Sequence, residues 1–153
     1  MIPVQVLAVQ YLANAAPGLC AGLGIPPGFP SLAMLTTDCD DATYIALDAA
    51  TKAAEVEAAY ARSFYAGSAN ASTPNAGEVI GILAARTPDA ARSGMEAVLR
   101  TLEQVGFENL DGVPCLAHTV SSVGSFLAAE AGVPLGSAVA YLIAPPLEAM
   151  FAL

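Results

Sequence analysis

Residues 19–28 read LCAGLGIPPG, and residues 127–136 read LAAEAGVPLG. The two stretches lie 108 residues apart, and the alignment between them extends without a gap from Leu7–Asp40 to Cys115–Glu148. A repeat of this length indicates a duplicated structural unit, and two similar units present similar surfaces for symmetric contacts. The repeat therefore favours a building block over a catalyst. The identical positions in the quoted stretches are Leu19 with Leu127, Ala21 with Ala129, Gly24 with Gly132, Pro26 with Pro134 and Gly28 with Gly136.

The composition indicates a protein that assembles with other subunits. Hydrophobic residues make up 56% of the 153 residues and charged residues only 12%. A small globule cannot bury that much apolar surface alone, so we expect partners to cover part of it. The alternative is an alanine-rich core. The net charge is −9, and the few basic residues are scattered, which argues against nucleic-acid binding. They are Lys52, Arg62, Arg86, Arg92 and Arg100.

The chain carries no pattern of a membrane or secreted protein. Its first basic residue is Lys52, so the positive start of a signal peptide is missing. The longest apolar runs, such as Ala138–Ala144, reach about seven residues, whereas a membrane span needs 18 or more. The three cysteines, Cys20, Cys39 and Cys115, are odd in number and lack CxxC spacing. We therefore expect a soluble protein of a reducing compartment.

Short apolar runs alternate with helical stretches, which predicts an α/β (α+β) chain. Asp48 is expected to cap the second helix, and Thr87-Pro88-Asp89 to open the third, whose apolar residues share one face. Polar residues 67–77 form a loop, and Phe107–Gly112 a linker to a second copy that starts near Val113. The predicted strands are Val4–Tyr11, Ser31–Thr37, Thr43–Ala46 and Glu78–Ala85. The predicted helices are Asn14–Leu23, Ala49–Tyr65 and residues 87–105.

The repeat divides the chain into residues 1–108, a first domain, and residues 109–153, the N-terminal part of a second. The second copy stops where the counterpart of Thr43–Ala46 should begin. An incomplete domain leaves strand edges unpaired and apolar faces uncovered. Either the chain is a fragment of a longer protein, which we favour, or partner subunits complete it.

A series of short runs, in order and nearly end to end, resembles a known family. That family is the bacterial microcompartment shell proteins of the ethanolamine-utilisation L type. No single run is specific, but their succession and spacing are. The runs are Ser31-Leu32, Asp40–Ala46, Ala50-Thr51-Lys52, Tyr60–Gly67, Thr73–Val79, Leu116-Ala117-His118 and Ala140–Ala149.

The resemblance implies tandem, circularly permuted microcompartment domains, of which the second is incomplete here. It further implies that three chains form a flat pseudohexagonal tile, with other shell proteins as partners, around ethanolamine-degrading enzymes in the bacterial cytoplasm. The pores of such tiles are expected to open and close for small molecules. No cofactor is implied.

The resemblance also implies an ethanolamine site between subunits. Asp40, Asp41 and Glu78 match the family's acidic positions, and Phe107 is a weaker addition that needs a one-residue gap. A small ammonium alcohol requires carboxylates for its charge and an acceptor for its hydroxyl. Without the resemblance, a solvated turn in which aspartates cap local amides is the favoured interpretation of Asp40 and Asp41. The same acidic surroundings disfavour a reactive thiolate at Cys39.

His118 is the chain's single histidine, and Cys115 precedes it by three residues. Two ligands do not make a metal site, and a hydrogen-bonded structural histidine is the simpler interpretation. A zinc site formed by His118 and Glu148 is the alternative.

The sequence contains no catalytic motif. The glycine-rich run Gly18–Gly24 is neither GxGxxG nor a P-loop, and GxSxG is absent. Asp40 and Glu78 are two carboxylates without a recognisable reaction centre. We expect a non-enzymatic shell subunit. The second hypothesis is a small-molecule binding or sensing module of the same fold that does not assemble into a shell.

Overall fold

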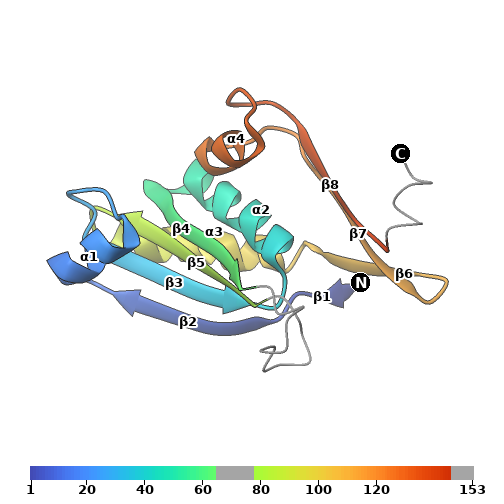
Figure 1. Ribbon diagram of the computed structural model, residues 1–153, viewed down its shortest axis with the longest axis horizontal. Helices are drawn as coiled ribbons and strands as arrows, with labels where there is room; N and C mark the ends of the chain where they lie inside the picture. Colours follow the sequence, from blue (N-terminus) through green and yellow to red (C-terminus); the bar gives the residue numbers. More distant parts are fainter. Residues whose placement is uncertain (65–77, 146–153) are drawn as a thin grey trace.

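The computed structural model describes residues 1–64 and 78–145, without the Glu78 side chain. Strands and helices are interspersed along this part of the chain, as predicted, and three pairs of strands, β1-β2, β4-β5 and β6-β7, follow one another directly (Figure 1). The strands are β1 (Ile2–Pro3), β2 (Val6–Leu12), β3 (Ser31–Thr37), β4 (Val56–Phe64), β5 (Glu78–Ala85), β6 (Gly106–Leu110), β7 (Val113–Val120) and β8 (Val139–Ile143). The helices are α1 (Pro17–Leu23), α2 (Asp40–Ala53), α3 (Pro88–Leu102) and α4 (Ser125–Ala131).

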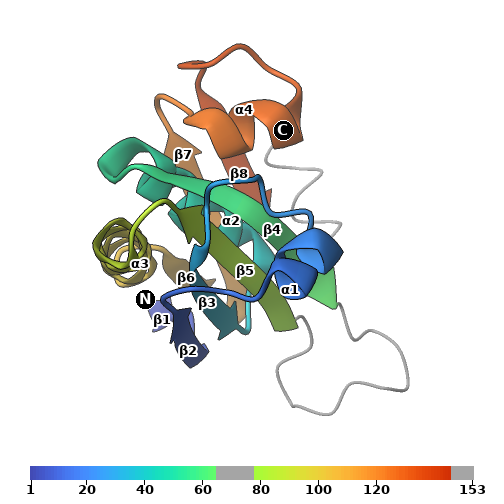
Figure 2. The same cartoon turned by 90° about the vertical axis from the view of Figure 1, so that its left-hand side faces the viewer.

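The first sheet has the strand order β2-β3-β5-β4, and every neighbouring pair is antiparallel. Helices α2 and α3 pack together on one face, and α1 lies at one end of the sheet (Figures 1 and 2). Side chains alternate between the two faces, as the pleat requires. On β3, Ala33 and Leu35 join the core beneath the helices, whereas Leu32 joins a smaller cluster with Ile25 and Ile82.

The third predicted helix is confirmed as α3, although it ends at Leu102. The side chain of Thr87 accepts a hydrogen bond from the amide of Ala90, and Pro88 occupies the first turn. Met95 and Val98 are fully buried on the face toward the sheet. The predicted bounds of β3 and β5 agree with the structure, whereas β2 and α1 begin later than predicted. The polar loop 67–77 lies outside the described residues.

The second sheet has the order β1-β6-β7-β8. The prediction of a linker at Phe107–Gly112 is wrong, because these residues belong to β6 and to a tight turn into β7. Leu110 pairs with Val113, and the two turn residues, Asp111 and Gly112, have φ angles of 53° and 91°. Positive φ at both positions is the geometry of a two-residue hairpin turn, which Asp-Gly favours.

The repeat in sequence is also a repeat in structure. The β2-α1-β3 order recurs as β7-α4-β8, with α1 and α4 displaced by the same 108 residues as the quoted stretches. Both helices end at a left-handed glycine, Gly24 with φ 68° and Gly132 with φ 64°. The next amide closes each end in the same way: Ile25 donates to the Cys20 carbonyl at 2.9 Å, and Val133 donates to the Ala128 carbonyl at 3.0 Å.

The stretch from Asp40 to Phe64 differs from the prediction. A strand at Thr43–Ala46 and a helix over Ala49–Tyr65 were expected, but α2 spans Asp40–Ala53 and β4 follows it. The buried residues Ala42, Ile45 and Ala46 recur with helical spacing. The alanines of β4 favour a helix locally, yet the strand pairs with β5 along its length. Tertiary pairing therefore overrides local propensity here.

The prediction that Asp48 caps the second helix is wrong. Asp48 instead orders the start of α4. Its fully buried carboxylate lies within α2 and accepts hydrogen bonds from the amides of Gly124, at 2.8 Å, and Leu127, at 2.9 Å. Lys52 lies 3.0 Å from the same carboxylate and donates to the Ser122 carbonyl at 2.8 Å. An aspartate of the first copy thus holds the helix of the second.

We predict that Asp48→Ala destabilises the protein by about 3 kcal/mol, because hydrogen bonds to a charged group contribute about 1.5–3 kcal/mol each and their buried donors would lose a partner. Urea unfolding measures the change. Glu103→Gln, an exposed acid at the end of α3, is the matched control. Equal stabilities of the two variants would contradict the role given to Asp48.

Candidate functional site

The turn Asp38–Asp41, here called the acidic turn, leads from β3 into α2 and is shaped by two buried threonines. Cys39 is the N-cap residue, and its carbonyl accepts bonds from the hydroxyls of Thr37, at 3.0 Å, and Thr43, at 2.8 Å. The two hydroxyl oxygens lie 2.6 Å apart, and both residues are fully buried. This network fixes the direction in which the chain leaves β3 and enters the helix.

Asp40 and Asp41 occupy the first turn of α2, where the helix macrodipole favours negative charge. The Asp41 amide donates to the Asp40 carboxylate at 2.9 Å. Burial, and then the charge of Asp40, raise the pKa of the Asp41 carboxyl above its ordinary value. Both side chains are partly buried, so the pair combines a concentrated negative charge with limited access to water.

The structure brings the backbones of the other predicted site residues toward this turn. Val79 pairs with Thr37 at the end of β3, which places Glu78, the preceding residue, beside the acidic turn. Asp38 accepts a hydrogen bond from the Gln5 amide at 2.8 Å. The nearby strand β1 pairs Ile2 with Phe107. Asp40, Asp41 and Glu78 thus lie on segments that meet at the start of α2, whereas Phe107 lies on β6, the neighbour of β1.

Cys39 lies in the same turn and is buried. Burial raises the pKa of its thiol to about 11, and the neighbouring aspartates add to the increase. The expectation of a disfavoured thiolate is confirmed. Burial contributes more to it than the negative charges on which the expectation rested.

An aromatic contact between the two copies was not predicted from the sequence. The rings of Tyr44 and Phe126 lie 5.9 Å apart, so α2 contacts α4 through them. Burial, and then the charge of Asp41, raise the pKa of Tyr141 on β8 to about 12. The sequence predicts Tyr44 on a strand, whereas it lies in α2. Helical spacing from Asp40 was the signal that could have revealed it.

His118 is half-buried on β7 and pairs with Tyr141 across the second sheet. Glu148, the other predicted zinc ligand, lies outside the described residues. Within residues 1–64 and 78–145, no group of three histidine, cysteine or acidic side chains is arranged to hold a metal ion. A zinc site at His118 and Glu148 stays a prediction.

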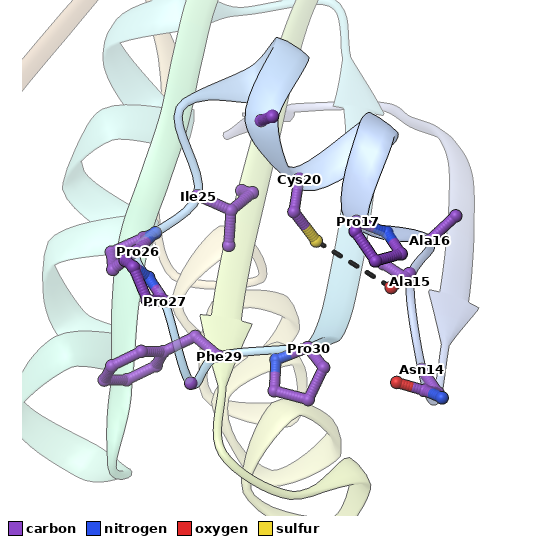
Figure 3. Close-up of a pocket in the computed structure, with 12 residues that line it drawn as sticks. Asn14, Ala15, Ala16, Pro17, Cys20, Ile25, Pro26, Pro27, Phe29 and Pro30 are labelled. Atoms are coloured by element: carbon purple, nitrogen blue, oxygen red, sulfur yellow. Dashed lines mark hydrogen bonds between the residues drawn. The ribbon is translucent and has the colours of Figure 1, made fainter.

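A mainly apolar pocket of about 570 Å³ lies between α1 and the proline-rich loop that follows it (Figure 3). Cys20 and Ile25 point into it, and the Cys20 thiol donates to the Ala15 carbonyl at 3.9 Å. A second pocket, of about 440 Å³, occupies the equivalent place beside α4. There Thr51 and Lys52 of α2 form part of the wall.

No helix in the described part of the chain has both the length and the apolar character that crossing a membrane requires. No family model matches the chain.

Curated relatives match the chain along its whole length. The microcompartment shell protein EutL of Clostridium perfringens is 50% identical over 157 aligned residues, which cover 100% of this chain and 72% of the relative. EutL of Salmonella typhimurium is 43% identical, and the match covers 99% of this chain and 71% of the relative.

Solved structures agree with the sequence matches. EutL of Leptotrichia buccalis superposes with a TM-score of 0.87 at 46% identity, over 99% of this chain and 74% of that chain. EtuB of Clostridium kluyveri superposes with a TM-score of 0.72 at 17% identity, over 90% of this chain and 60% of that one, which shows a shared fold only. The identity reaches 50% over the whole of this chain, and its fold superposes on that of EutL. The chain therefore belongs to the EutL family of bacterial microcompartment shell proteins.

Proposed function

We propose that the chain is a non-enzymatic structural subunit of a microcompartment shell in the bacterial cytoplasm. The observation that carries this proposal is the duplicated fold, joined through Asp48, in a chain that is 50% identical to a shell protein over its full length. We further infer that residues 1–108 and 109–153 belong to two tandem shell domains. The boundary falls inside β6, which ties the domains together by pairing with both β1 and β7.

Exposed apolar side chains along an unpaired sheet edge support assembly into homotrimers and larger tiles. Within residues 1–64 and 78–145, strand β2 pairs only with β3 and forms the edge of its sheet. Four of its large apolar residues are between 37% and 43% exposed. An edge of this kind promotes association unless a partner covers it. The residues are Val6, Leu7, Tyr11 and Leu12.

The acidic turn is the proposed binding site for a small ammonium alcohol such as ethanolamine. The carboxylates of Asp40 and Asp41 supply charge for the ammonium group, and Glu78 lies on the adjacent strand end. Partial burial strengthens the attraction, because the effective dielectric constant is lower than in water. Phe107 supplies an apolar side to the site. The ligand gates a pore only through its different affinities for the open and closed arrangements.

We predict that the purified protein, mixed with the other shell proteins of its microcompartment, forms extended flat layers in electron micrographs. Repeated subunits with open apolar edges tile in two dimensions, whereas a sensing module would remain as discrete particles. Single discrete particles under every assembly condition would contradict the shell function and favour the sensing module.

We also predict that Asp41→Asn weakens ethanolamine binding about tenfold, which corresponds to about 1.4 kcal/mol. Isothermal titration calorimetry measures the affinity. Asp89→Asn on the exposed start of α3 is the control, because it removes an aspartate from another helix N-terminus.

The pH dependence has a definite sign. The raised pKa of Asp41 means that this carboxyl takes up its proton at a higher pH than an ordinary aspartate. The affinity should therefore fall as the pH drops through that raised pKa, and Asp41→Asn should lose this dependence. Unchanged affinity in both Asp41→Asn and Glu78→Ala would remove the acidic turn from the binding site.

A further inference from the structure

Among residues 1–64 and 78–145, only one buried side-chain nitrogen or oxygen atom has no hydrogen-bond partner. It is the hydroxyl oxygen of Ser63, near the end of β4. Nearby buried hydroxyls are paired: those of Thr37 and Thr43 lie 2.6 Å apart, and both donate to the Cys39 carbonyl. Buried polar groups in proteins are normally hydrogen-bonded, so the exception at Ser63 needs a physical reason.

Ser63 lies beside the acidic turn. It pairs with Val79 of β5, and Val79 pairs with Thr37 at the end of β3, so the three residues form a row across the sheet. Side chains directly opposite each other on paired strands share a face. Thr37 bonds to Thr43 of α2, which places the whole row on the face that α2 covers. Glu78, a residue of the proposed binding site, directly precedes Val79.

Tyr44 of α2 connects Ser63 with the charges of the acidic turn. Burial, and then the charge of Asp40, raise the pKa of the Tyr44 hydroxyl, whereas a hydrogen bond with the Ser63 backbone lowers it. Tyr44 therefore lies within reach of both Ser63 and the first turn of α2. Ser63 as a residue is only partly buried, so a change to another staggered rotamer can bring its hydroxyl to the surface.

We propose that the Ser63 hydroxyl accepts a hydrogen bond from the hydroxyl of the ligand and makes the acidic turn selective for an ammonium alcohol over a simple alkylammonium ion. The inference rests on the proposed ethanolamine site and names the residue that sets its specificity. The carboxylates of Asp40 and Asp41 attract either cation, because both ligands carry one positive charge. Ser63 separates them, because only the alcohol offers it a hydrogen-bond partner.

The unpaired state of Ser63 favours this role. A buried hydroxyl without a partner forgoes the bonds that it makes with water, and the hydroxyl of a bound ligand restores one of them. A ligand with a methyl group in that place leaves the serine unpaired. Sites that hydrogen-bond a hydroxyl of their ligand reject analogues that lack it for this reason. Because the Ser63 hydroxyl bonds to no other described residue, Ser63→Ala should keep the wild-type melting temperature.

Calorimetry with ethanolamine and propylamine tests the proposal, because propylamine has a methyl group where ethanolamine has its hydroxyl. The wild-type protein should bind ethanolamine at least about tenfold more tightly than propylamine. In Ser63→Ala this preference should fall below about threefold, since only ethanolamine loses a hydrogen-bond partner. Ser93→Ala removes an exposed hydroxyl from α3 and is the matched control, which should keep the wild-type preference.

The outcomes separate the role of Ser63 from the proposed binding site itself. A folded Ser63→Ala protein that still prefers ethanolamine would overturn the role of Ser63 and leave the acidic turn as an ammonium site. Equal binding of the two amines by the wild type would do the same. A wild-type protein that binds neither amine would overturn the proposed ethanolamine site, and the role of Ser63 with it.

Discussion

The carboxylate of Asp48 is the contact on which the arrangement of the two copies depends. A charge removed from water must be compensated, and here two amides of the α4 start and the Lys52 ammonium group compensate it. Each of these groups has a fixed direction, so the carboxylate sets where the second copy lies on the first. Lys52 is 39% exposed, and its bond to the Ser122 carbonyl places it at the rim of the same contact. Gly124 completes the fit by leaving room for the carboxylate.

This contact joins the two copies into one unit. They meet through α2 and α4, whereas α1, the helix equivalent to α4, carries no buried residue. The acidic turn sits at the start of α2, and the aromatic contact of Tyr44 with Phe126 lies on the same helix. The binding site proposed at the turn therefore lies next to the contact between the two copies.

Much of this fold could be predicted where the signals are local. The strands β3 and β5 are short, largely apolar runs, α3 has a threonine cap and a proline in its first turn, and the αL glycines end both repeat helices. The carboxylates of the acidic turn were also identified from residue type and resemblance. Prediction failed where a distant partner decides the structure. Strand β4 exists because β5 pairs with it, and Asp48 bonds to residues 76 and 79 positions away, which no local pattern reveals. The Asp111-Gly112 turn was predicted wrongly for another reason. Asp-Gly is a local hairpin signal, but the residues around it were interpreted as a linker.

Amide hydrogen exchange followed by NMR tests most directly whether Asp48 holds the second copy to the first. The amide of Leu127 should exchange in the wild-type protein as slowly as that of Ala33 in the buried strand β3, because both open only when the molecule unfolds. In Asp48→Asn the exchange of Leu127 should accelerate selectively, while that of Ala33 changes only with global stability. An amide at Leu127 that already exchanges quickly in the wild type, or that is unaffected by the substitution, would contradict this account.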